Sequence, residues 1–142
     1  MLNHEGLFSA AERRSASRAV PAYAEETNEP HIRSVEARFL RAWRNSVMIV
    51  GARYFGTGKI ADLEKAASKW DLVPRLSTIR HGVVTLERTE QMFLSALLSL
   101  YNPHEAVRLR KQCGLTDFLD LNLLDPVRRE LLSELLLNST GW

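Results

Sequence analysis

The sequence has little cysteine and no long apolar run, and these absences narrow the choice of protein class. A single cysteine, Cys113, excludes an intrachain disulfide, and no Cys-x-x-Cys pair or Cys/His cluster has the spacing of a zinc site. The longest apolar run, Val47 to Val50, has four residues, whereas a bilayer span needs roughly 20. Residues 1–30 lack a basic start followed by an apolar stretch, so we expect no secretory signal. These absences predict a cytoplasmic protein with no membrane partner.

The composition is ordinary for one globular domain. The chain has 142 residues, of which 45% are hydrophobic and 25% charged, and a chain of this length folds without disulfides. Five Glu and three Arg give residues 1–30 a net charge of −2. Sixteen Lys and Arg against twelve Asp and Glu give residues 31–142 a net charge of +4. That charge is lower than a dedicated nucleic-acid-binding domain usually carries, although it does not exclude one.

Residues 1–30 are predicted to form a polar N-terminal tail, because their large apolar side chains are few and scattered. Within this tail, residues 9–19 are compatible with a short helix, since Ser9 and Glu12 have the spacing of a capping box. Residues 20–30 are too polar to offset an ordering cost of about 1–2 kcal/mol per residue, so we expect them to be flexible in the isolated protein. Residues 31–142 are predicted to form a single helical domain.

Apolar residues recur with helical spacing through this domain, which predicts an all-α bundle of about five or six helices. Residues 32–54 are predicted to form the first helix, ended by Gly56-Thr57-Gly58. Its apolar stripe consists of Val35, Phe39, Trp43, Val47 and Val50. The run from Val47 to Val50 is apolar on every side and is therefore expected to be buried. A short helix with Trp70 on its packed face is predicted at residues 60–70.

In the second half of the chain, residues 75–80 are predicted to be helical and to be followed by a loop, although Gly82 to Leu86 could equally form a short extended segment. Residues 87–101 form the most apolar helix, which we expect at the centre of the bundle. Asn102 and Pro103 have the pattern of an N-cap and first helical residue, and the helix that they start ends at Cys113, before Gly114.

Two further elements are expected after Gly114. Thr116 is predicted to cap a short turn that carries Phe118, Leu119 and Leu121. Asp125 and Pro126 start the last helix, residues 126–137. The side chains expected to be buried by this helix are Val127, Leu131, Leu132, Leu135 and Leu136.

The sequence contains no recognisable catalytic or cofactor-binding motif. Gly56-Thr57-Gly58-Lys59 lacks the first glycine and the final Ser or Thr of a phosphate-binding loop. The histidines His4, His31, His81 and His104 have no partner at the spacing of a metal pair. Asp117, Asp120 and Asp125 stand at predicted helix starts, where carboxylates cap the helix. We therefore expect no enzyme, no cofactor and no metal.

Arginines on the first predicted helix form one candidate binding face. They lie opposite the apolar stripe, and at 100° per residue three of them fall within about 80° of one another. The residues are Arg33, Arg38, Arg41 and Arg44. Arginine is enriched at protein interfaces because its planar guanidinium pairs with carboxylates through two hydrogen bonds. This face predicts an acidic partner, although a solvated face is the simpler interpretation.

Residues 62–82 partly fit the helix-turn-helix pattern of DNA-binding repressors. Three positions of the pattern are matched: the small residue by Ala66, the serine by Ser77 and the terminal glycine by Gly82. The turn position, which usually needs glycine, is occupied by Trp70. If the pattern held, five side chains would face a DNA groove. They are Arg75, Ser77, Thr78, Arg80 and His81.

The sequence therefore favours a non-enzymatic helical protein that acts by binding another protein, as an inhibitor, adaptor or regulator. The alternative is a DNA-binding transcriptional regulator that uses a degenerate helix-turn-helix at residues 62–82.

Overall fold

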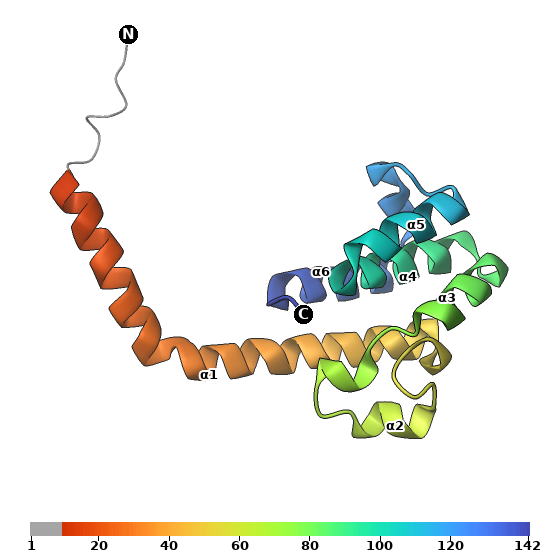
Figure 1. Cartoon of the computed structure of the whole chain (residues 1–142), viewed down its shortest axis with the longest axis horizontal. Coiled ribbons are helices and arrows are strands. Elements are labelled where there is room, and N and C mark those ends of the chain that lie inside the picture. The colour runs from red at the N-terminus through yellow and green to blue at the C-terminus, as the bar shows by residue number, and fades with distance from the viewer. Residues whose placement is uncertain (1–9) are drawn as a thin grey trace, which may run out of the picture. The chain divides into compact units, whose positions relative to one another are not determined.

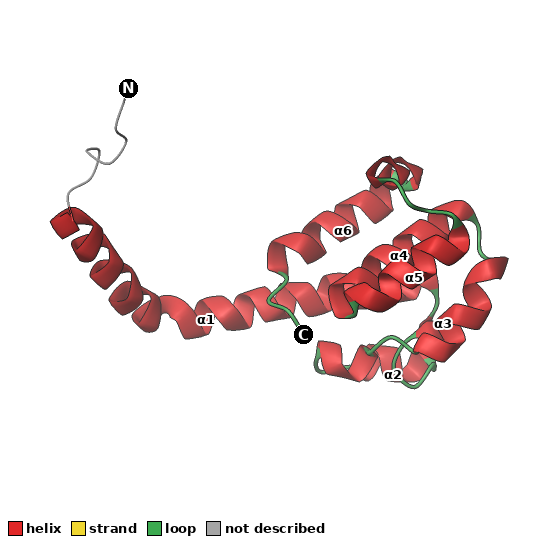
Figure 2. Cartoon of the chain, turned by 45° about the horizontal axis from the view of Figure 1, so that its top comes forward, coloured by secondary structure: helices red, strands yellow, loops and turns green. Residues whose placement is uncertain are grey.

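The computed structural model describes the backbone of residues 10–142 and the side chains of residues 30–142. By its internal contacts the chain divides into two units, residues 1–34 and 35–142. The described residues form an all-α structure, as predicted, whose one β-type pairing is an isolated bridge between Phe55 and Pro74 (Figures 1 and 2). The elements are α1 (Ala10–Val50), η2 (Ala52–Tyr54), α2 (Ile60–Lys65), η3 (Lys69–Leu72), α3 (Leu76–Gly82), η4 (Val83–Thr85), α4 (Arg88–Tyr101), α5 (Pro103–Cys113), η5 (Phe118–Leu123) and α6 (Pro126–Asn138), where η denotes a 3-10 helix.

The core of the second unit is built around α4, as predicted for residues 87–101. Eight consecutive residues of this helix, Gln91 to Leu98, are buried. Helix α5 lies alongside α4 in both views (Figures 1 and 2). The predicted stripe of α1 is confirmed at Phe39, Trp43 and Val47, which are buried at steps of four residues. Its two end residues, Val35 and Val50, are half-buried.

Most helix starts and stops follow local capping signals. The Asn102 side chain accepts a hydrogen bond from the Glu105 N–H at 3.2 Å, which begins α5. Gly114 has a φ of 71° and ends α5 in the left-handed conformation that glycine adopts without strain. The prediction that Thr116 caps the next turn is wrong. Asp117 is the cap, because its carboxylate accepts the Leu119 N–H at 2.8 Å while Asp120 bonds back to the Asp117 N–H.

Helix α1 ends earlier than predicted and exposes more of its last turn. It stops at Val50, because Gly51 has a φ of 124°, outside the helical region. The prediction that Val47 to Val50 are all buried is wrong, since Met48 is 52% exposed and Ile49 is also exposed. The core lies on one side of α1 only, so successive residues at 100° intervals turn away from it.

The segment between α1 and α4 also differs from its predicted form. Helix α2 ends at Lys65, and a capping box between Ser68 and Asp71 starts η3 in place of a continuous helix. Trp70 is therefore exposed and not on a packed helix face. Helix α3 reaches Gly82 and continues as η4, whereas a loop was expected after residue 80.

The N-terminal predictions concern residues for which the structure describes little. Ser9, the expected cap of a helix at 9–19, lies outside the described residues. The backbone from Ala10 onward is part of α1, which passes through residue 30 without a break. A domain boundary at residue 30 stays a prediction.

Candidate protein-binding surface

The predicted arginine face is only partly exposed to solvent. Arg38 and Arg41 are exposed on α1 in the second unit, and Arg33 is exposed in the first. Arg44 was expected on the solvent side, but it is half-buried and its guanidinium donates a 2.6 Å hydrogen bond to the Ala66 carbonyl. Ala66 is the C-cap residue of α2, where carbonyl groups lack helical partners and attract cations. Arg44 thus links α1 to α2.

The predicted helix-turn-helix residues do not adopt that geometry. Ten residues, including η3, separate the end of α2 from the start of α3, whereas the motif has a turn of three or four. Gly82 is buried for a packing reason, because a Cβ atom there would lie 2.8 Å from the Tyr54 ring.

Four of the five proposed DNA-contacting side chains are exposed, although both arginines among them bond to groups of the same chain. Arg80 pairs with Glu105 at 2.8 Å, and Arg75 donates to the Arg53 carbonyl at 3.0 Å. Thr78 is half-buried, whereas Ser77 and His81 are exposed, and the His81 ring contacts the Ser77 carbonyl. This geometry does not favour the DNA-binding alternative.

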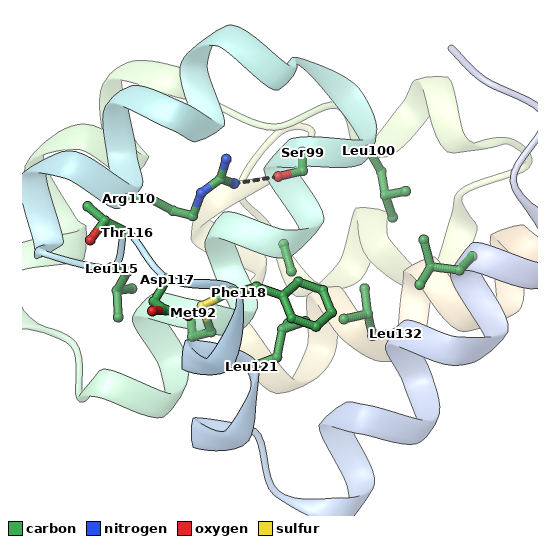
Figure 3. Close-up of a pocket in the computed structure, with 12 residues that line it drawn as sticks. Met92, Ser99, Leu100, Arg110, Leu115, Thr116, Asp117, Phe118, Leu121 and Leu132 are labelled. Carbon is green, nitrogen blue, oxygen red and sulfur yellow. Dashed lines mark hydrogen bonds between the residues drawn. The ribbon is translucent and has the colours of Figure 1, made fainter.

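A surface that the sequence analysis missed lies where α4, η5 and α6 meet. It is a hollow of about 400 Å³ with a mainly apolar lining (Figure 3). Its apolar lining residues are Met92, Ala96, Leu100, Leu115, Phe118, Leu121, Leu132 and Leu136. Figure 3 shows the Phe118 ring beside Leu121 and facing the side of Leu132.

Local structure explains why apolar side chains border this hollow without being buried. The Asp117 and Asp120 capping box turns the chain sharply after buried Leu115, which leaves Phe118 81% exposed. On α6, only Leu131 and Leu135 are buried. The prediction that Val127 and Leu136 are buried is wrong, since they are 57% and 62% exposed.

Two charged groups, Arg110 and Asp117, lie within the lining of the hollow. Arg110 of α5 donates a 2.8 Å hydrogen bond to the Ser99 hydroxyl, which itself donates to the Ser95 carbonyl at 3.0 Å. Asp117 also lines the hollow, but its carboxylate is used as the cap of η5. The hollow therefore offers apolar contact area with a guanidinium at its edge, which suits apolar side chains accompanied by an anionic group.

The signal for this surface was present in the sequence as a surplus of leucine. Helix α6 has one valine and five leucines in 13 residues, more than a surface helix needs for one buried face. A helix with this composition is either enclosed or leaves part of its apolar surface uncovered. The surplus predicts exposed apolar area, but not which leucines are exposed.

Comparisons with protein-family models, with curated proteins and with solved structures found no match to this chain. In residues 10–142, no helix combines the length and the apolar character needed to cross a membrane. Among the described side chains, no group of three or more His, Cys, Asp or Glu could hold a metal ion. The exposed apolar surfaces are therefore the observations from which a function can be inferred.

Proposed function

We propose that this protein acts by binding another protein through the hollow between α4, η5 and α6, as a non-enzymatic inhibitor, adaptor or regulator. The observation that supports this is the exposure of Phe118 and Leu136 in the lining of an apolar hollow. Their chain neighbours Leu119 and Leu137 are exposed as well. Adjacent exposed apolar side chains around a concave surface are typical of interaction sites.

The chemistry of the hollow indicates what kind of segment binds there. An amphipathic helix places apolar side chains at steps of three and four residues along one face, which suits a short apolar groove. A carboxylate on that segment would accept hydrogen bonds from Arg110, whose guanidinium is half-buried and so less screened by water. We therefore propose an amphipathic, acidic helix as the bound element.

Site-specific photo-crosslinking tests the proposal, with the protein expressed in cells of the organism whose genome encodes it. A photoreactive side chain at Leu136 should give a discrete adduct with one protein. The matched control is Ile60 on α2, which is 65% exposed and does not line the hollow. The same reagent at Ile60 should give no such adduct.

The double change Phe118→Asp with Leu136→Asp provides the second arm of this test. It should abolish an adduct formed from a photoreactive group at Leu132, which also lines the hollow. Both replaced side chains are exposed, so the melting temperature should change little. Equal adducts from Leu136 and Ile60, or an adduct that survives the double change, would contradict the proposal.

A further inference from the structure

A second hollow, of about 440 Å³, lies between α1 and α6 within residues 35–142. Each helix contributes residues at steps of three and four, so each presents one face to this groove. From α1 these residues are Arg41, Asn45, Met48 and Ile49. From α6 they are Val127, Glu130, Leu131 and Glu134.

Part of the lining of this groove is apolar and exposed. Met48 and Val127 are 52% and 57% exposed, and Ile49 is exposed beside Met48. Leu131 is buried beneath them. Burial of apolar area is favourable by roughly 25 cal/mol per Å². An occupant that covered these side chains would therefore form a more stable complex.

The two walls of the groove carry opposite charges. Arg41 is exposed on the α1 wall, whereas Glu130 and Glu134 lie on the α6 wall. Within the part of the chain whose side chains are described, no ion pair joins Arg41 to either glutamate. The charges of both walls are thus available to groups outside the molecule.

This charge pattern is complementary to itself. A two-fold rotation brings the basic wall of one molecule against the acidic wall of an identical molecule, and the same contact is then repeated on the other side of the axis. Apolar side chains accompanied by charged ones are also usual in a protein interface. A different protein would need to match both walls separately, whereas a second copy matches both automatically.

We propose that a second copy of this chain occupies the groove between α1 and α6 and forms a two-fold symmetric dimer. Helices α1 and α6 of each copy pack together as a four-helix arrangement. Arg41 of one copy faces Glu130 and Glu134 of the other, and Met48 faces Val127. The α6 residues of this interface differ from Leu132 and Leu136, which line the hollow proposed for another protein. The dimer is therefore independent of that proposal.

Charge reversal with mixing of the variants tests this dimer. Wild-type protein should sediment with twice the monomer mass of 16.1 kDa at about 200 μM, where a dimer with a micromolar Kd is largely formed. Arg41→Glu alone places like charges at both symmetric contacts. The double change Glu130→Arg with Glu134→Arg does the same with the opposite sign. Each variant should dimerise at least about 100-fold more weakly than the wild type.

An equimolar mixture of the two variants should form a heterodimer, because each contact then pairs a basic with an acidic wall. A repulsion within one molecule cannot produce this recovery. Lys65→Glu, an exposed charge reversal on α2 away from the groove, should dimerise like the wild type. Met48→Glu, at an exposed position, should weaken the dimer without unfolding the protein, which circular dichroism checks.

A monomeric wild type would overturn the proposal. So would variants that remain dimeric alone, or a mixture that stays monomeric.

Discussion

The indole nitrogen of Trp43 donates a 3.0 Å hydrogen bond to the carbonyl oxygen of Leu72, 29 residues further along the chain. Trp43 is fully buried, and its ring stacks on Phe39 with centroids 5.7 Å apart. The edge of a third aromatic ring, Trp142, meets Trp43 at 5.4 Å. The hydrogen bond attaches α1 to the last residue of η3, and the ring contact attaches α1 to Trp142.

Replacement of Trp43 and of Trp142 by phenylalanine, one at a time, should separate the contribution of the hydrogen bond to stability from that of the packing. Trp43→Phe leaves the Leu72 carbonyl without its donor, which costs about 1–3 kcal/mol in addition to lost packing. Trp142→Phe loses a similar volume, but its indole nitrogen is buried without a partner among the described residues. Urea unfolding should therefore show the larger loss for Trp43→Phe. Equal losses would show that the hydrogen bond adds nothing.

Truncation of Leu97 in the middle of α4 should destabilise the protein by about 2–5 kcal/mol. Leu97 is fully buried in the core, so Leu97→Ala removes contacts and leaves a cavity. The matched control is Leu137→Ala on α6, where the side chain is 83% exposed and the expected change is within about 0.5 kcal/mol. Thermal melts of both variants measure the difference. Similar stabilities would place the core elsewhere.

Arg44 and Arg41 should behave differently when each is replaced by methionine, although they are one turn apart on α1. Arg44→Met removes the donor to the Ala66 carbonyl, which should cost about 1–3 kcal/mol. Arg41→Met removes an exposed charge and should change stability by less than about 0.5 kcal/mol. Urea denaturation at low protein concentration measures both. A larger loss for Arg41 would contradict the assignment of Arg44 as the structural arginine.

Asp125 should contribute to stability in a way that disappears in acid. The Arg128 backbone N–H donates to its carboxylate at 2.9 Å, and with the Arg128 guanidinium it lowers the pKa of Asp125 below its ordinary value. Because the folded pKa lies below the unfolded value, the stabilisation is present above the unfolded value and is lost as pH falls through the folded one.

Asp125→Asn tests this charge effect, because asparagine is also a good N-cap. The wild type should be more stable than this variant at neutral pH, and the difference should shrink in the acid range. Asp125→Ala should be less stable than Asp125→Asn at every pH, because the cap itself is lost. A wild-type advantage that is independent of pH would exclude the carboxylate charge as its source.

Cys113 should react slowly with thiol reagents in the folded protein. Burial raises the pKa of its thiol, and the opposing effect of Arg88 is smaller. Since the thiolate is the reactive form, alkylation by iodoacetamide at neutral pH should be several-fold slower than in urea. Mass spectrometry of timed samples measures both rates. Equal rates would mean that the thiol is freely accessible at the end of α5.

The candidate surface was only partly predictable. The leucine surplus of α6 is visible in the sequence, yet Leu135 is buried and Leu136 exposed, although they are neighbours. Likewise, the arginine stripe identified Arg41, but it also included Arg44, whose bond to Ala66 spans 22 residues. A pattern on one helix shows which residues share a face, but not what packs against that face.

The sequence by itself determined the all-α class, the central position of α4 and the caps at Asn102, Gly114 and Asp125. A cap depends on side chains and backbone groups that lie within three or four residues of one another, and the helical class depends on the periodicity of apolar residues. Both are properties of spacing along the chain, which the sequence fixes. Only the tertiary structure decided which apolar residues of α1 and α6 remain exposed. Burial depends on which distant elements cover a helix. In residues 35–142, α6 and the last part of α1 are covered on one side only, which leaves Met48, Val127 and Leu136 exposed.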